Sequence, residues 1–257
     1  MKMIKSGLVS ATFKGLEVQQ VLRIARNAGL QAIEWSENHH IPCGDEAFAS
    51  TVGKLTADAG LEIAGYGSYY RLGQGMDILP SLRTAKAIGA KQVRIWAGTK
   101  ASADVCAEER KALVKELVQA CRTASDMGIV LNLEWHKNTL TDTNESGLAL
   151  LRETACDNLH TLWQPTMALN EEQRKEGLGM ILPYLSYLHV YHWDQTGRRP
   201  LEEGRRPWDI YFATLDPEKD YYALLEFVKD DSEQQFYKDA DVLKEMLDYG
   251  RSAHRLF

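Results

Sequence analysis

The residues of this sequence best suited to chemistry are carboxylates and a carboxamide at the ends of short apolar segments. Glu134 is the next-to-last residue of IVLNLEW, Gln164 closes LHTLWQ, and Glu226 lies near the end of ALLEFV. A buried carboxylate without a partner is costly, so such groups need a cation, a proton or a network of donors. Because alternate residues of a strand share a face, Glu134 goes with Asn132 and Glu226 with Leu224. If these faces point inward, the two carboxylates converge.

Histidines recur at the same kind of position. His189 and His192 lie in YLHVYHW, and His40 and His136 follow two other apolar segments. Carboxylate oxygens, an amide oxygen and an imidazole together suit a divalent metal such as Mn²⁺, Mg²⁺, Co²⁺ or Zn²⁺. Each residue alone also has a structural interpretation, because a strand-end Glu is often an ion-pair partner and perturbed groups occur outside functional sites. Their recurrence at equivalent strand ends is what indicates a site.

A weak internal repeat predicts the elements that position these residues. Four times an amphipathic run ends in small residues and a glycine, and a short apolar segment follows; the glycines are Gly29, Gly60, Gly89 and Gly128. Glycine adopts the left-handed conformation that ends many helices without a Cβ penalty. The apolar segments are rich in Val, Ile and Leu, as in strands buried on both faces. The repeat therefore predicts βα units and a parallel sheet.

Eight strands fit along the chain, and this number favours a closed barrel. We place them at 7–13, 30–35, 61–67, 90–98, 129–135, 159–164, 187–193 and 223–228, with a closing loop and a final helix over 229–257. The chain has 257 residues, and a (β/α)₈ TIM barrel typically needs roughly 250. No G-x-G-x-x-G loop follows the first strand, although an open dinucleotide-binding sheet would be expected to have one. We predict an α/β fold with a single TIM barrel domain over 1–257.

Composition excludes several classes of protein. The net charge is −6 and no run of Lys or Arg stands out, so a nucleic-acid partner is not expected. No segment reaches the roughly 20 apolar residues of a membrane helix, and the N-terminus has no signal-peptide pattern. The four cysteines are scattered without a C-x-x-C pair, which argues against a disulfide framework or structural zinc. We expect a cytoplasmic protein that binds neither nucleic acid nor membrane.

Six segments together carry a resemblance to a known family. They are GLQAIEWSENHHIP (29–42), GAKQVRIWAG (89–98), VLNLEWHKNTLTDT (130–143), LWQP (162–165), LHVYHWDQTGRRPLEEG (188–204) and LLEFVKDD (224–231). In order and spacing they resemble the xylose isomerase-like TIM barrel superfamily, in its sugar phosphate isomerase/epimerase branch. That branch is similar to hydroxypyruvate isomerase, ketose 3-epimerases and inosose dehydratase. The resemblance covers nearly the whole chain and is not specific for one reaction.

The resemblance implies a metal site with a Glu from strand five, an Asp from strand six, a His or Gln from strand seven and a Glu from strand eight. The matching residues here are Glu134, Gln164, His192 and Glu226. His189 is the rival of His192, since the two differ in parity and cannot both point inward on a regular strand. Gln164 replaces the family's Asp, which removes a negative charge and should weaken metal binding. His136 and Lys137 stand where the family has a further Glu.

The function implied by the resemblance is a metal-dependent isomerase or epimerase of a small ketose or related hydroxy-carbonyl compound, acting through an enediolate. Glu134 and Glu226 are the expected acid–base pair, and Trp96 and Trp135 the expected walls of the cup. The expected substrate-binding residues are His40, Trp96, His136, His189 and Arg198. A dehydratase acting on a keto-polyol by the same chemistry and a non-catalytic sugar-binding protein are the alternatives. Dimers or tetramers are usual in the families it resembles, so we expect a homodimer or homotetramer.

Overall fold

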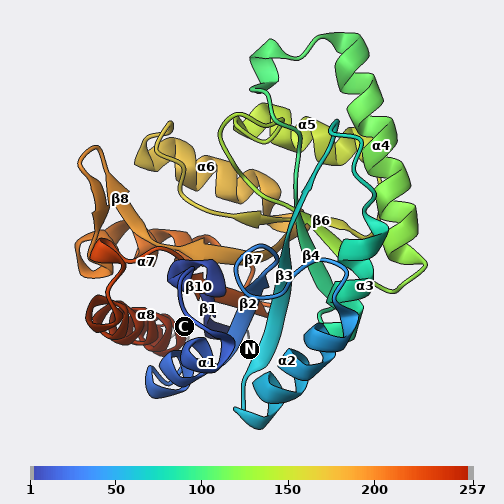
Figure 1. Ribbon diagram of the computed structural model, residues 1–257. Coiled ribbons are helices and arrows are strands. Elements are labelled where there is room, and N and C mark those ends of the chain that lie inside the picture. The colour runs from blue at the N-terminus through green and yellow to red at the C-terminus, as the bar shows by residue number, and fades with distance from the viewer. Residues whose placement is uncertain (1–2, 254–257) are drawn as a thin grey trace.

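The computed structural model describes residues 3–253 and shows a closed barrel of eight parallel strands inside a layer of helices (Figure 1). Around the ring the strands follow the order β1-β10-β7-β6-β5-β4-β3-β2. Their bounds are β1 Ile4–Val9, β2 Ala32–Ser36, β3 Glu62–Arg71, β4 Gln92–Trp96, β5 Val130–Leu133, β6 Leu159–Trp163, β7 Leu185–Val190 and β10 Tyr221–Leu225. The predicted (β/α)₈ TIM barrel is confirmed.

The α-helices of the described residues alternate with the barrel strands, which is what allows neighbouring strands to run parallel. Their bounds are α1 Val18–Asn27, α2 Glu46–Asp58, α3 Leu79–Ile88, α4 Ala107–Ser125, α5 Asn144–Thr154, α6 Glu171–Ile181, α7 Arg205–Thr214 and α8 Glu233–Ala253. The predicted final helix corresponds to α8, and the last part of its predicted range, 254–257, lies outside the described residues. No helix within 3–253 is long and apolar enough to cross a bilayer.

Glycines stop the helices where the repeat predicts. Gly29, Gly60, Gly89 and Gly128 all have positive φ, at 68°, 72°, 93° and 70°. A residue with a Cβ adopts this conformation only at a cost, so glycine turns the chain sharply from each helix toward the next strand. The four helix–Gly–strand units of the sequence are therefore confirmed as helix–turn–strand units.

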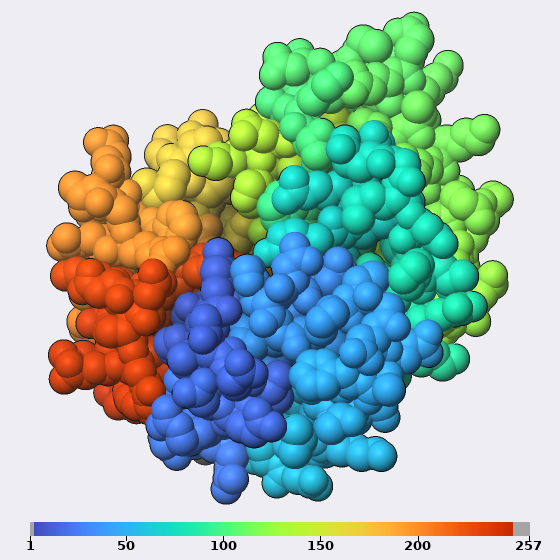
Figure 2. Space-filling view, viewed as in Figure 1, coloured from blue at the N-terminus to red at the C-terminus, as the bar shows by residue number. Residues whose placement is uncertain are grey.

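The barrel closes between the first and the last barrel strand. β1 pairs in parallel with β10, and Gly7 lies opposite Leu224 in this register. A Cβ on Gly7 would come within 2.5 Å of a Leu224 side-chain carbon, so the glycine makes room for the leucine in the narrow interior. Figure 2 shows the consequence at the surface, where the blue N-terminal segments lie directly against the red C-terminal ones.

An apolar cluster lies inside the barrel below the polar strand ends. It is made of Val9, Ala11, Ala32, Ala64, Leu162, Tyr187 and Leu224. The intervening strand residues point outward and pack under the helices in the main hydrophobic core. This alternation is the period of two expected for strands covered on both faces. Because of this alternation, only every second residue at a strand end points into the mouth of the barrel.

The bounds of most predicted strands differ from the structure by a few residues, and two of the differences change the path of the chain. The segment 7–13 is strand only to Val9, and Ser10–Phe13 forms a 3₁₀ turn. The segment 187–193 is interrupted at Tyr191, so β7 ends at Val190. Beyond that point β8, His192–Asp194, pairs with β9, Gly197–Arg199, in an antiparallel hairpin outside the barrel. The sequence around Tyr191 contains no turn signal that would mark this interruption. The residues after Tyr191 leave the barrel because they pair with a segment further along the chain.

Candidate active site

Polar side chains from six of the eight strands meet at the carboxyl end of the barrel. Three lie within or at the end of strands β2, β4 and β7, and three directly follow strands β5, β6 and β10. In barrels of this kind the βα loops leave a cup at this end, above the packed interior. We call these six residues the mouth cluster; with their exposed fractions they are Glu34 (0%), Arg94 (6%), Glu134 (6%), Gln164 (6%), His189 (0%) and Glu226 (9%).

His189 is held between two carboxylates. Its Nε2 lies 3.1 Å from an oxygen of Glu34, and its Nδ1 lies 3.3 Å from an oxygen of Glu226. Burial would lower the pKa of His189, but Glu226 and Glu34 outweigh burial and raise it to about 10. The ring is therefore an imidazolium at neutral pH, with a proton on each nitrogen.

Glu34 is ionised in this arrangement. Burial would raise the pKa of its carboxyl, but the charge and hydrogen bond of His189, the charge of Arg94 and the hydroxyl of Tyr187 together hold it below its usual value. With these partners the buried carboxylate stays ionised near neutral pH. Its role is to hold the imidazolium of His189 in place.

A second ion pair lies beside the first. Arg94 Nη1 is 3.2 Å from one oxygen of Glu134, and Gln164 Nε2 donates to the other oxygen at 3.3 Å and to the Trp135 carbonyl at 2.9 Å. Burial opposes the charge of Arg94, but Glu134 and Glu34 raise its pKa further above the usual value. The Glu134 carboxylate thus lies between a guanidinium and a carboxamide.

Tryptophans anchor the strand ends that carry this cluster. On β2, β5 and β6 the chain neighbour of the mouth residue is a Trp that points outward into the helical layer. Trp35 donates to Thr56 of α2 at 3.1 Å, and Trp163 packs edge-on to Trp208 of α7 at 6.0 Å. Trp135 lies so close to Gly147 of α5 that a Cβ there would be 2.2 Å from its ring. With each ring fixed outward, the adjacent polar side chain must point inward.

Trp96 stands at the rim of the mouth between two other planar groups. His136 stacks on it with ring centroids 4.9 Å apart, and the Arg71 guanidinium carbon lies 3.8 Å from the centroid of one of its rings. We call Arg71, Trp96 and His136 the aromatic rim. Flat apolar faces of this type suit the C–H surface of a sugar, and a stacked guanidinium is held ready for an anion.

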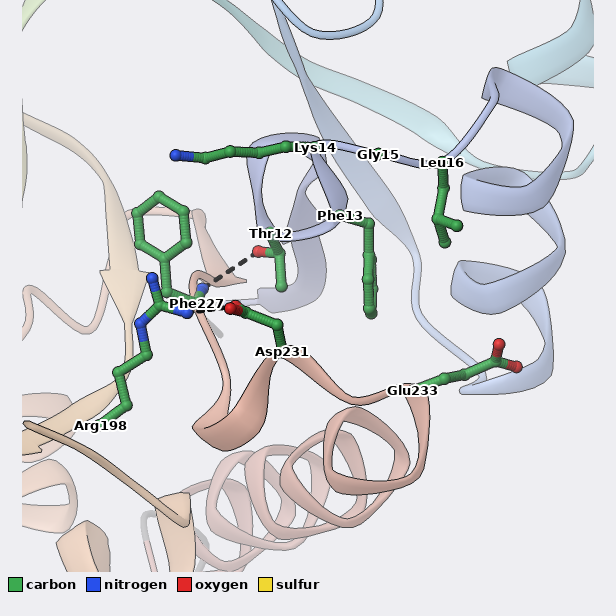
Figure 3. Close-up of a pocket in the computed structure, with 9 residues that line it drawn as sticks. All are labelled: Thr12, Phe13, Lys14, Gly15, Leu16, Arg198, Phe227, Asp231 and Glu233. Atoms are coloured by element: carbon green, nitrogen blue, oxygen red, sulfur yellow. Dashed lines mark hydrogen bonds and ion pairs between the residues drawn. The ribbon is translucent and has the colours of Figure 1, made fainter.

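Arg198 lies beside the mouth against a cavity of about 490 Å³ (Figure 3). It is paired with Asp231, and its guanidinium carbon lies 4.8 Å from the centroid of the Phe227 ring. Phe227 directly follows Glu226 and has a positive φ of 53°, a conformation that a bulky residue rarely adopts. Its backbone N–H donates to Thr12 Oγ1 at 3.1 Å. This bond holds the strained turn that presents Glu226.

The structure does not bring His192 or His40 to the mouth cluster. His192 belongs to the β8–β9 hairpin and packs on Gly204, where a Cβ would lie 2.7 Å from the imidazole Cγ. His40 packs edge-on to the outward-facing Trp35 at 5.7 Å, and burial lowers its pKa to about 4. Trp135 is likewise outside the cup. His189, the rival of His192, is the histidine at the mouth, because β7 ends one residue after it.

Two residues of the mouth cluster, Glu34 and Arg94, are absent from the site predicted by sequence. A signal for Glu34 exists, since Ile33-Glu34-Trp35 repeats the apolar-Glu-Trp pattern that ends in Trp135. Arg94 is a lone charge within an otherwise apolar strand, which indicates a buried partner but does not say which one.

Comparison with known proteins agrees with this architecture. The family model described as xylose isomerase-like TIM barrel matches residues 22–246. The chain belongs to this family. A curated 3-dehydroshikimate dehydratase of Bacillus anthracis is 23% identical over 260 residues, covering 87% of this chain and 91% of that protein.

Several solved structures superpose over nearly the whole chain. A probable 3-DHS dehydratase of B. anthracis has a TM-score of 0.80 at 20% identity, covering 94% of this chain and 99% of that one. D-psicose 3-epimerase of Clostridium cellulolyticum H10 has a TM-score of 0.72 at 13% identity, with 97% and 99% covered. A barrel protein of Mycobacterium smegmatis in complex with magnesium has a TM-score of 0.69 at 14% identity, with 96% and 98% covered.

The side chains expected to bind a divalent metal do not fit one as they are arranged. Glu134 already faces the guanidinium of Arg94 and the amide nitrogen of Gln164. Both nitrogens of His189 face carboxylate oxygens, at 3.1 Å and 3.3 Å, so an ion bound to either nitrogen would have to come between the ring and a carboxylate. Within residues 3–253 no three His, Cys, Asp or Glu side chains are grouped so as to hold a metal.

Proposed function

We propose that this protein moves a proton next to the carbonyl of a small hydroxy-carbonyl compound, as an isomerase or epimerase acting through an enediolate. The observation that carries the proposal is the pairing of each candidate base with a buried cation. Glu134 lies 3.2 Å from Arg94, and Glu226 lies 3.3 Å from His189. The similarity to a D-psicose 3-epimerase supports a ketose as the substrate class.

In this proposal Glu134 and Glu226 are the acid–base pair. One carboxylate takes the proton from the carbon beside the carbonyl, the electron pair moves onto the carbonyl oxygen, and an acid returns the proton to the neighbouring carbon or to the opposite face. The buried cations Arg94 and His189 stabilise the negative charge that develops on oxygen, and burial strengthens this effect. Because the side chains do not fit a divalent ion, no step is assigned to one.

Substrate binding is assigned to the residues that surround the mouth cluster. Trp96 and His136 offer a flat wall at the rim, 4.9 Å apart from each other in their stack. His189 replaces His192 as the imidazole of the proposed site. Arg198 is kept as a contact for a terminal anion, in exchange for Asp231, because it borders the cavity that Phe227, the chain neighbour of Glu226, also lines (Figure 3).

Exchange with solvent deuterium tests the proposal directly. The protein is incubated in D₂O with a panel of ketoses, and incorporation of deuterium beside the carbonyl is followed by NMR. We expect exchange with at least one ketose and a loss of at least about 100-fold in Glu226→Gln, since a positioned acid or base contributes that much or more. The control is Glu172→Gln on the exposed start of α6, which should leave the rate unchanged. No exchange with any ketose would contradict the proposal.

A dehydratase is the second candidate, and the aromatic rim favours it. Arg71 is stacked at 3.8 Å on Trp96, and within residues 3–253 no carboxylate lies within ion-pair distance of it. A fixed and unneutralised guanidinium suits the carboxylate of a keto acid, and a curated relative is a 3-dehydroshikimate dehydratase. Incubation with 3-dehydroshikimate distinguishes the two, because loss of water gives a product with new ultraviolet absorbance. Ligand-induced stabilisation without exchange or water loss would instead indicate the non-catalytic sugar-binding alternative.

A further inference from the structure

Arg94 is a buried guanidinium with donors left over. It extends from β4 into the mouth, is 6% exposed, and pairs with Glu134 through Nη1. The contact of Nη1 with Glu134 is an ion pair without hydrogen-bond geometry. Within the described residues, neither Nη1 nor Nε makes a hydrogen bond. A guanidinium carries five N–H donors and cannot lose its charge, so burying unmet donors is costly unless a ligand or water completes them. These donors point to a bound oxygen ligand.

The chain is shaped to hold this guanidinium at the mouth. Gly67 of β3 lies opposite Arg94 in the sheet, and a Cβ there would lie 3.0 Å from Arg94 Nη2 and 2.7 Å from Glu34 Oε1. Glycine at this position leaves the space that the guanidinium and the carboxylate fill. The rings of Tyr69 and Trp96 lie above it, 5.6 and 5.7 Å from the guanidinium carbon.

The charges around Arg94 do not leave a place for a second cation. Glu134 is shared between Arg94 and Gln164, and the carboxamide of Gln164 is neutral. The mouth holds three carboxylates, Glu34, Glu134 and Glu226, facing the two basic side chains Arg94 and His189. A divalent ion bound to Glu134 would have to displace the guanidinium of Arg94, which lies 3.2 Å from the carboxylate.

We infer that Arg94 takes the place of a divalent metal in this barrel: its guanidinium holds two adjacent oxygens of a hydroxy-carbonyl ligand or of the enediolate formed from it. The nature of the ligand rests on the proposed function, but the exclusion of metal does not. Arg94 donates hydrogen bonds and stays charged throughout. The proton leaves the substrate carbon for a carboxylate, and the electron pair comes to rest on the oxygen that Arg94 binds.

Metal binding without any substrate is the first test. The protein is treated with EDTA, desalted and titrated with Mn²⁺, and binding is followed by calorimetry and by Tm. We expect a shift below about 1 °C for the wild type and for Gln164→Asp, which keeps Arg94. The double variant Arg94→Met, Gln164→Asp should gain about 5–10 °C once Mn²⁺ reaches roughly a hundred times its Kd. If that variant is unfolded without metal, Mn²⁺ should refold it.

Two results overturn the inference in this test. One is stoichiometric binding of Mn²⁺ by the wild type. The other is a double variant that Mn²⁺ neither stabilises nor refolds, since Arg94 would then not be what keeps the metal out.

Oxalate in the presence of EDTA is the second test, because it is a planar dianion with adjacent oxygens like those of an enediolate. We expect it to raise the Tm of the wild type and to have no effect on Arg94→Gln, Glu134→Gln, in which both charges of the pair are removed together. Stabilisation by oxalate only after Mn²⁺ is added, or no stabilisation at all, overturns the inference. Deuterium exchange that EDTA abolishes and Mn²⁺ restores would refute the inference and leave the proposed function intact. Metal-free oxalate binding without exchange on any ketose would do the reverse.

Discussion

The substitution Glu34→Gln tests whether the buried triad Glu34–His189–Glu226 is charged. It removes one of the two carboxylates that contact His189 and keeps the shape of the side chain. The pKa of His189 rises from 6.5 to about 10 in the folded protein, and each unit corresponds to about 1.4 kcal/mol. The raised pKa therefore corresponds to roughly 5 kcal/mol of net stabilisation near pH 6, with the cost of burying the ring already subtracted, and we expect loss of Glu34 to remove about 2–3 kcal/mol.

The pH dependence of this loss has a definite sign. A group whose pKa is raised on folding contributes its full stabilisation below the unfolded pKa and loses it as pH rises through the folded pKa. For His189 the window runs from 6.5 to about 10. The Glu34 carboxyl, whose pKa is lowered, is ionised throughout this window and adds no slope. The difference in unfolding free energy between wild type and Glu34→Gln should therefore be largest near pH 6 and shrink toward about pH 10.

Urea denaturation at several pH values measures this difference, because groups common to both proteins cancel in it. Glu62→Gln is the matched control: Glu62 also pairs with a cation, Lys5 at 2.6 Å, but its side chain is 48% exposed. An exposed pair contributes only about 0–1 kcal/mol. Equal losses for the two variants, or a loss for Glu34→Gln that does not change with pH, would show that His189 is not an imidazolium between two carboxylates.

Three further predictions concern the residues around the mouth. Gly67→Ala should lower the unfolding free energy measured by urea denaturation by about 1–3 kcal/mol, since its Cβ would come within 2.7 Å of the Glu34 carboxylate. The control Gly179→Ala, whose Cβ meets nothing within 4 Å, should be neutral or stabilising. His189→Asn should reduce deuterium exchange by about 100-fold or more, and His192→Ala by less than about 3-fold; the opposite order would return the imidazole role to His192. Trp96→Ala should raise KM by about tenfold with kcat nearly unchanged, because this ring contacts substrate away from the reacting atoms; a loss confined to kcat would contradict that role.

The fold could be predicted from sequence because its signals are local. Each of the four glycines that stop a helix does so through its own φ, and the apolar segment after it is marked as a strand by its own residue types. The same holds for the inward direction of Glu134 and Glu226, which follows from a period of two counted from adjacent apolar residues. These features are properties of a few consecutive residues.

The remaining parts of the candidate site depend on contacts between distant segments. His189 lies at the mouth and His192 does not, because the barrel strand ends at Val190 and His192 pairs with Arg199 in the hairpin beyond it. The ion pair of Arg94 with Glu134 exists only because β4 and β5 are neighbours in a closed ring. A sequence pattern can show that Arg94 is an unusual charge in an apolar strand, but the partner that neutralises it is a fact of three-dimensional register.

The charges at the mouth are not needed to build the barrel. Apolar side chains pack inside the barrel below them, among them Val9, Leu162 and Leu224. Replacing a buried ion pair by well-packed apolar residues is often neutral or stabilising, whereas removing one partner costs about 3–5 kcal/mol. A chain under selection for stability alone would therefore continue the apolar layer upward. Five charged side chains stand there instead, each base beside a cation, which is the arrangement needed to remove a proton and to hold the negative charge that results.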